Sequence, residues 1–337
     1  KFKNFKAYDD KVLKVLNLNE KEGLKLYLET FIDRKFDYEQ FTEHAENTGF
    51  NNKYVNVTPK EGRKTISPKY CDKNIFFYGG STTFGYNVTD KQTIASYLGN
   101  YLIDNDLRIC VKNYGRGSYF STQENILFQK HILNKIVNSK DIVIFIDGIN
   151  ENGNKVSRNT EFLFQANKII NQKHWDMYKL SLPFFFNTLP INQFINRLSS
   201  KIKFKEEQKK NPQNIFSKDE MAKYVYQTNV NFRIGICKNL KIECYSFFQP
   251  FPVINGKYFD EQPSGASEVR RILNKEERKI INQKYFELKS VDNIYDISQS
   301  INNMTTLSYV DAVHYSPRAN EIIAMTIIDV IKDHFNE

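Results

Sequence analysis

The sequence lacks several features that would assign it to a well-marked class of protein. No apolar run approaches the roughly 18–20 residues that span a bilayer, so we expect no transmembrane helix within its 337 residues. It carries no zinc-finger, homeodomain or RNA-recognition signature. It also has no fixed-period repeat and no low-complexity tract, which argues against a solenoid and against a disordered linker protein. At ~150 residues per domain, the length allows one large domain or two ordinary ones.

Cysteine is scarce and its spacing carries no metal signature. None of the four cysteines forms a CxxC pair, and the spacing of cysteine and histidine fits no zinc template. Cys110 and Cys244 lie in apolar runs that are typical of strands. We therefore expect Cys71, Cys110, Cys237 and Cys244 to be buried reduced thiols, with a Cys237–Cys244 disulfide as the alternative.

The composition that is present favours a packed core. Hydrophobic residues make up 40% of the chain, charged residues 26% and aromatics 14%. The net charge is +9, but lysine and arginine are interleaved with acidic residues, as in 201–207. Such interleaving is typical of a solvated surface, so we expect no nucleic-acid partner.

Short apolar strands alternate with amphipathic helices from about residue 74. Strands are predicted at 75–78, 109–111, 142–146 and 240–248. Helices are predicted after Asp90, which is the expected cap of the first one, over 123–138 and after Ser316-Pro317. This alternation predicts a mostly parallel sheet with helices on both faces, and such sheets carry their chemistry at the carboxyl ends of the strands.

Two stretches depart from that rhythm. Residues 1–65 are polar and mixed, and we interpret them as an N-terminal extension packed on a main domain of residues 66–337. Residues 151–232 interrupt the strand pattern with aromatic and charged segments, and we interpret them as a helical insertion or cap.

The turn after the first predicted strand, Gly79 to Gly85, carries the first chemical signal. A phosphate-binding loop would need lysine after its last glycine, and Tyr86 stands there. The alternative is a nucleophile turn, in which glycines let the backbone bend sharply and hold Ser81 at the strand end. The Ser81 N–H could then help to stabilise an oxyanion.

The second signal is Asp311-Ala312-Val313-His314, just before the last helix. A carboxylate three residues before an imidazole can reach its Nδ1–H, which leaves Nε2 to take a proton from serine. Taken alone, this segment could equally be an exposed loop next to a helix cap.

Two further turns follow predicted strands. Asn150, in Asp147-Gly148-Ile149-Asn150-Glu151, could offer an amide donor at the strand end, and the turn 113–118 could offer a backbone N–H. A different interpretation makes Asp147, Glu151, Asp311 and His314 a metal site of a phosphodiesterase, but it leaves Ser81 without a role.

Taken together, in this order along the chain, the four blocks resemble the SGNH (GDSL-like) hydrolase family. The matching positions are Gly79-Gly80-Ser81, the turn 115–118, Gly148-Ile149-Asn150 and Asp311 to His314, so that the resemblance extends from about residue 70 to the C-terminus. The strand end at Gln249-Pro250 is also similar to members of this family.

The resemblance implies a flavodoxin-like three-layer α/β/α sandwich. It implies Ser81 as nucleophile, His314 as general base and then acid, and Asp311 as the residue that orients His314. The implied oxyanion donors are the Ser81 N–H, a backbone N–H at Gly117 or Ser118, and the Asn150 side chain. Two departures stand out: the acidic residue of the family's Gly-Asp-Ser block is Gly80 here, and Ser118 falls where the Gly block has its glycine.

From this resemblance we expect a serine ester hydrolase that works through an acyl-enzyme, without metal or organic cofactor. The expected substrate is a small-molecule or glycan ester, such as an acetylated carbohydrate. The alternatives are an O-acyltransferase that uses the same triad on a cell-envelope glycan, and a non-catalytic binding module of the same fold.

The chain begins at Lys1 rather than Met, so a membrane tether upstream of Lys1 and an extracytoplasmic location are expected. The oligomeric state stays open.

Overall fold

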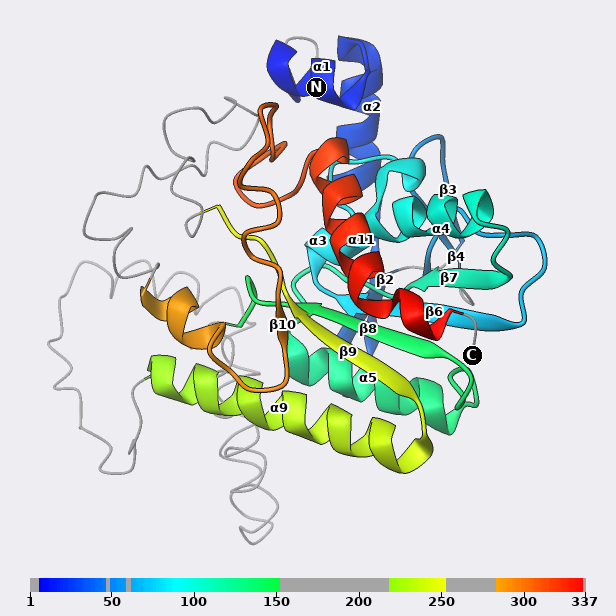
Figure 1. Ribbon diagram of the computed structural model, residues 1–337. Coiled ribbons are helices and arrows are strands. Elements are labelled where there is room, and N and C mark those ends of the chain that lie inside the picture. The colour runs from blue at the N-terminus through cyan, green and yellow to red at the C-terminus, as the bar shows by residue number, and fades with distance from the viewer. Residues whose placement is uncertain (1–5, 47–48, 59–61, 152–217, 253–282, 336–337) are drawn as a thin grey trace, which may run out of the picture. The chain divides into compact units, whose positions relative to one another are not determined.

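The computed structural model describes residues 6–46, 49–58, 62–151, 218–252 and 283–335 (Figure 1). The helices are α1 (Asp10–Leu16), α2 (Glu20–Phe31), α3 (Ser81–Phe84), α4 (Ile94–Asp104), α5 (Ser121–Leu133), α9 (Lys218–Leu240) and α11 (Pro317–Ile331), with short turns η1 (Asp90–Gln92) and η2 (Lys332–His334). The strands are β1 (Phe36–Glu39), β2 (Glu43–Glu46), β3 (Phe50–Asn51), β4 (Asn56–Thr58), β5 (Gly62–Arg63), β6 (Lys73–Gly79), β7 (Ile109–Asn113), β8 (Ile142–Asp147), β9 (Glu243–Phe248) and β10 (Tyr295–Asp296).

The centre of the fold is a parallel sheet. Its strands run in the order β7-β6-β8-β9-β10, and every neighbouring pair among these five is parallel. Numbered along the chain, this is the order 2-1-3-4-5 of flavodoxin-like proteins, in which the direction of winding reverses between the first and third strands. That switch point lies between the ends of β6 and β8, the strands that Ser81 and Asn150 follow.

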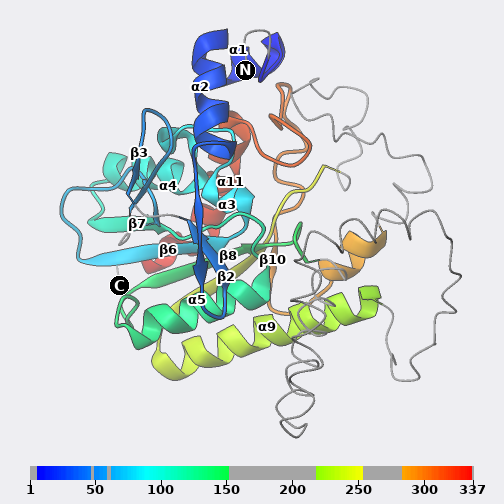
Figure 2. The ribbon, with the colours of Figure 1, turned by 180° about the vertical axis from the view of Figure 1, so that it is seen from behind.

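Side chains that alternate along the strands build two cores, one on each face. Ile75 and Phe77 of β6 pack with α4 and α11, whereas Phe76 and Tyr78 pack with α5 and the end of α9. Figures 1 and 2 show these helix pairs on opposite sides of the sheet. The predicted α/β sandwich with a mostly parallel sheet is therefore confirmed. Its central strands read as unbroken apolar runs because both faces are buried.

The N-terminal segment adds strands to this sheet. Strands β3, β4 and β5 extend the edge beyond β7, with β5 parallel to β7 and the outer pairs antiparallel. Helices α1 and α2 share an apolar cluster with Phe84, Val88 and Val310, which adjoin the Ser81 and Asp311 blocks. Residues from 6–46 and 49–58 thus pack against side chains next to the Ser81 and Asp311 blocks.

Local capping places the helix starts. Ser316 accepts a hydrogen bond from the Ala319 N–H, and Pro317 opens α11, as predicted. The cap of α4 is Thr93, which accepts from the Ser96 N–H, so the prediction of Asp90 as its cap is wrong. Asp90 instead begins the short turn η1 and accepts from the side chain of Arg63.

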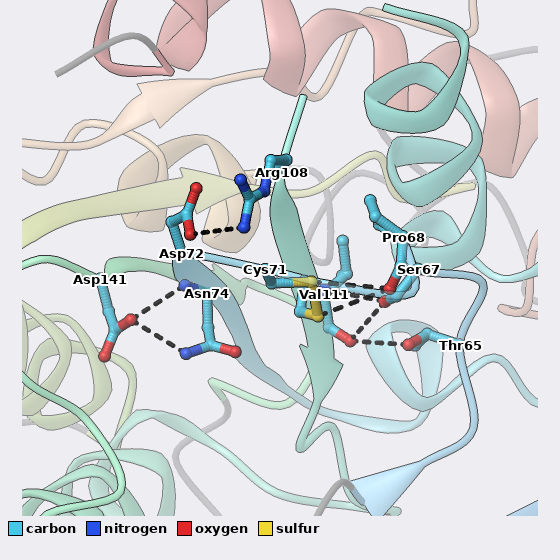
Figure 3. Close-up of a disulfide and its surroundings, with 10 residues drawn as sticks. Thr65, Ser67, Pro68, Cys71, Asp72, Asn74, Arg108, Val111 and Asp141 are labelled. Carbon is cyan, nitrogen blue, oxygen red and sulfur yellow. Dashed lines mark hydrogen bonds and ion pairs between the residues drawn. A yellow bond between two sulfur atoms is a disulfide. The ribbon is translucent and has the colours of Figure 1, made fainter. Parts of the chain in front are cut away.

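The cysteines form two disulfides, so the expectation of reduced thiols is wrong. Cys71 pairs with Cys110, with their Cα atoms 5.4 Å apart, and Cys237 pairs with Cys244 at 6.1 Å. Figure 3 shows the first bond fastening the loop before β6 to strand β7. Spacing along the chain does not reveal this pair, because the two cysteines are 39 positions apart and only the sheet brings them together.

The predicted insertion at 151–232 lies largely outside the described residues, which resume at residue 218 with α9. By its internal contacts the chain divides into two units, residues 1–151 with 223–337 and residues 152–222. No helix within the described ranges is both long and apolar enough to cross a membrane.

Candidate active site

Ser81 stands at the first position of α3, directly after β6. Gly79 and Gly80 shape this turn, because a Cβ at Gly79 would overlap the Thr83 side chain and one at Gly80 would overlap the Asn150 amide nitrogen. The first N–H groups of a helix have no partner within it. The Ser81 N–H, at the first position of α3, therefore has no acceptor within that helix.

Asp311, His314 and Ser81 form a continuous chain of hydrogen bonds. Asp311 Oδ2 lies 2.6 Å from His314 Nδ1, and His314 Nε2 lies 2.9 Å from Ser81 Oγ. The loop that carries Asp311 and His314 is closed by a backbone hydrogen bond from Val310 N to the His314 carbonyl. The structure therefore brings together residues that are 233 positions apart in the chain.

The surroundings of Asp311 favour its charged form. Burial alone would raise the pKa of its carboxyl, but the His314 imidazole and the backbone N–H groups of His314 and Val313 outweigh burial and hold the pKa below its usual value. Both backbone N–H groups donate to Oδ1 at 2.8 Å. A carboxylate fixed in this way can hold the imidazole in one tautomer and stabilise an imidazolium.

The predicted oxyanion donors come from the ends of β7 and β8. Gly148 turns with a φ of +135°, and the Asn150 amide that follows donates to the Tyr119 carbonyl at 2.8 Å. That carbonyl also lies within 3.3 Å of where a Cβ of residue 80 would stand, so this turn and the Ser81 turn are neighbours. Asn150 is thereby placed beside the residue that precedes Ser81.

Ser118 adopts a φ of +65°, in the left-handed region that favours glycine. A glycine, which the resemblance would place here, adopts this conformation without strain. Gly117 is held from the N-terminal segment, because His44 Nε2 lies 2.9 Å from its carbonyl oxygen. A side chain at Gly117 would overlap the Tyr86 hydroxyl.

Sequence reasoning missed two residues that contact the triad. The Tyr86 ring stacks on the His314 imidazole, with centroids 5.0 Å apart and planes at 20°. The Asn87 amide donates to Asp311 Oδ2 at 2.5 Å. Both follow the Ser81 turn, and the sequence signals them only as a tyrosine and an asparagine close behind Ser81.

Arg34 of the N-terminal segment supports Tyr86. Its guanidinium carbon lies 4.2 Å from the centroid of the Tyr86 ring, and it also hydrogen-bonds the Tyr86 hydroxyl. Glu46 lies 3.2 Å from the Arg34 Nε, and both side chains are buried. The Arg34–Glu46 ion pair, which lies outside the four blocks, therefore contacts the Tyr86 ring that stacks on His314.

Asp147 and Glu151, which flank the Asn150 block, belong to a separate buried cluster. Arg233 lies 2.6 Å from Asp147, while Glu151 accepts from the Ser121 N–H at 2.6 Å and from its hydroxyl at 2.9 Å. These partners differ from those of Asp311 and His314. Among the described residues, no group of three or more histidine, cysteine, aspartate or glutamate side chains could hold a metal ion.

The fold and this geometry define a flavodoxin-like α/β protein with a Ser-His-Asp hydrogen-bond chain at the carboxyl ends of its strands. No family model matches the sequence, and no curated protein matches it either. Similar solved structures include an acetylxylan esterase, Axe2, from Geobacillus stearothermophilus, with 14% identity, a TM-score of 0.42, and coverage of 78% of this chain and 95% of that one.

Two further similar structures have comparable scores. One is a member of the lipolytic G-D-S-L family from Veillonella parvula, with 11% identity, a TM-score of 0.40, and coverage of 77% of this chain and 98% of that one. The other is a lipase/acylhydrolase from Enterococcus faecalis, with 12% identity, a TM-score of 0.41, and coverage of 77% and 96%. A G-D-S-L family protein is thus among the similar structures, as the four blocks predict.

Proposed function

We propose that this protein is a serine ester hydrolase that works through an acyl-enzyme. The observation that carries the proposal is the pair of hydrogen bonds that joins Asp311 to His314 at 2.6 Å and His314 to Ser81 at 2.9 Å. A serine hydroxyl within reach of an oriented imidazole is the arrangement that activates a nucleophile.

In the first half-reaction, Ser81 Oγ attacks the ester carbonyl carbon while His314 Nε2 takes the serine proton. The tetrahedral intermediate collapses, and the same proton passes to the leaving alcohol. Water then attacks the acyl-enzyme, His314 takes a proton from it, and the acid leaves as Ser81 regains its hydrogen. Asp311 stays ionised throughout and stabilises the imidazolium.

The developing oxyanion would be stabilised by donors at three strand ends. They are the Ser81 N–H, a backbone N–H of the Gly117-Ser118 turn, and the Asn150 amide. The Tyr119 carbonyl orients the Asn150 amide, which carries two N–H bonds. The Ser118 backbone, at a φ of +65°, keeps the turn in the conformation that a glycine would adopt.

The substrate that we propose is a small acyl ester, such as an acetyl group on a carbohydrate. The triad supports hydrolysis and transfer equally, so an acyl-sugar product that increases with acceptor concentration would instead indicate a transferase. The two disulfides support an extracytoplasmic location, because disulfides persist in oxidising compartments.

The test is hydrolysis of p-nitrophenyl acetate together with labelling by a fluorophosphonate. We expect the label on Ser81 in a digest, and we expect Ser81→Ala to lose at least about a thousandfold in kcat. Ser139→Ala, an exposed serine on a loop, is the matched control and should keep wild-type activity. Equal rates for wild type and Ser81→Ala, or a label on another residue, would refute the serine mechanism.

A further inference from the structure

A second chain of hydrogen bonds approaches the triad from the N-terminal segment. The Tyr8 hydroxyl donates to Asn87 Oδ1 at 2.6 Å, and Asn87 Nδ2 donates to Asp311 Oδ2 at 2.5 Å. The same Oδ2 atom lies 2.6 Å from His314 Nδ1. Tyr8 and Asn87 are both buried, at 4% and 1% exposure, so the two bonds are sheltered from water.

The chemistry of the two ends of an amide gives Tyr8 a specific role. If the Asn87 side chain were turned over, its carbonyl oxygen would face the Asp311 carboxylate, and two acceptors would meet. A hydroxyl donor at the other end favours the orientation with Nδ2 toward Asp311. Burial, together with the nearby Asp311 carboxylate, raises the pKa of Tyr8 well above its usual value, so the phenol keeps its proton.

The four bonds to Asp311 leave its carboxylate in one orientation. Oδ1 accepts the backbone N–H groups of Val313 and His314, and Oδ2 accepts the His314 ring and the Asn87 amide. The Asn87 bond is the one that comes from outside the Asp311–His314 loop. This bond therefore links the Asp311–His314 loop to the segment that follows the Ser81 turn, where Asn87 lies.

We propose that Asn87 and Tyr8 are positioning residues of the active site, in which Tyr8 fixes the amide of Asn87 so that it holds Asp311 in line with His314. The proposal rests on the proposed serine mechanism. It makes the N-terminal segment a working part of the catalytic unit, because Tyr8 precedes α1 and shares its apolar cluster with Phe84 and Val310.

The experiment removes one atom at a time. Tyr8→Phe keeps the ring in its cluster and deletes the donor, and we expect kcat for p-nitrophenyl acetate to fall about 5- to 20-fold. Neither Tyr8 nor Asn87 is a proposed oxyanion donor or the proposed nucleophile, so KM should stay within about twofold of the wild-type value. Tyr54→Phe, in the same apolar cluster but outside this chain of bonds, is the matched control and should retain wild-type kcat.

Asn87→Ala and the double variant show whether the effect passes through the amide. Asn87→Ala should lose more than Tyr8→Phe. The double variant should be no slower than Asn87→Ala, because Tyr8 acts only through Asn87. Asn87→Asp, of the same shape but with an acceptor in place of the donor, should also lose kcat. Rates are expressed per site titrated by fluorophosphonate, so that misfolded protein is not counted.

Three results would overturn the proposal: an unchanged kcat in Tyr8→Phe, losses that multiply in the double variant, or wild-type kcat in Asn87→Asp. These are distinct from a failure of the serine mechanism itself, which would appear as a wild-type protein that neither hydrolyses the ester nor takes the label at Ser81.

Discussion

Gly80 illustrates how one residue decides whether two strand ends can meet. The resemblance would place an acidic residue at this position, and the structure gives the reason for glycine, since a Cβ would overlap the Asn150 amide nitrogen. The consensus Gly-Asp-Ser and this chain's Gly-Gly-Ser are therefore not interchangeable here. A side chain at 80 would displace the proposed oxyanion donor rather than complete the motif.

We expect Gly80→Ala to lower kcat by about a hundredfold with the serine still present, because removing one oxyanion donor costs on the order of 100-fold or more. Gly235→Ala is the control. Gly235 lies within α9 with no atom within 4 Å of its Cβ position, so alanine should stabilise the helix by up to ~1 kcal/mol. Ester hydrolysis and thermal unfolding of both variants measure the two effects. Full activity in Gly80→Ala would show that the Asn150 amide is not an oxyanion donor.

At the scale of elements, the strand β8, the helix α5 and the helix α9 meet in a cluster of three carboxylates around one arginine. Arg233 lies 2.6 Å from Asp147 and 4.0 Å from Glu124, its charge also acts on Glu151, and all four side chains are buried. Burial, with Asp147 close by, raises the pKa of Glu151 to about 7. The same two causes raise the pKa of Glu124 well above its usual value.

This pKa makes the stability of the fold depend on pH. Between about pH 4.5 and 7, the folded protein keeps the Glu151 proton that the unfolded chain releases, so this group's contribution falls as pH rises. In wild type, Glu151 should lower the free energy of unfolding by roughly 3 kcal/mol as pH rises through that window. Glu151→Gln, which keeps an acceptor for Ser121, should not show this decrease. The measurement is the urea midpoint of both proteins at pH 5 and pH 8.

The comparison with wild type is needed because His131 contributes the opposite slope. Burial lowers the pKa of His131 to about 4, so folding gains stability as pH rises from there to about 6.5. In Glu151→Gln the opposite effects of His131 and Glu124 both remain, so the variant should lose less stability than wild type between pH 5 and pH 8. Identical pH profiles for the two proteins would mean that Glu151 is ionised in the fold.

At the scale of the whole molecule, two covalent links fasten the sheet. Cys71–Cys110 closes a loop of 39 residues and Cys237–Cys244 one of 7 residues. From loop entropy alone, they should stabilise the fold by about 4 and about 2.5 kcal/mol.

We expect the denaturant midpoint to fall when the protein is reduced, and the double variant Cys71→Ser/Cys110→Ser to lose more than Cys237→Ser/Cys244→Ser. A thiol assay on the unfolded, unreduced protein should find no free thiol. Four reactive thiols in that assay would show that the cysteines are reduced in solution.

The parallel sheet could be predicted because buried strands must be apolar on both faces, as 142–146 are. The four blocks could be found because sharp turns and oxyanion donors need particular residue types next to strand ends. Arg34 and the Cys71–Cys110 pair could not be found in this way. Their partners are distant in the chain, and the residues around a single arginine or cysteine do not indicate a distant partner.

The sequence by itself determined the alternation of strands and helices, since hydrophobic periodicity is local. It also singled out four candidate site residues, because turn chemistry is local too: Ser81, Asn150, Asp311 and His314. Only the tertiary structure decided that His314 lies 2.9 Å from Ser81 and that Tyr8 and Arg34 reach the triad through Asn87 and Tyr86. Those contacts depend on how the N-terminal segment packs against the Ser81 and Asp311 turns, and burial between distant segments leaves no periodic trace in the chain.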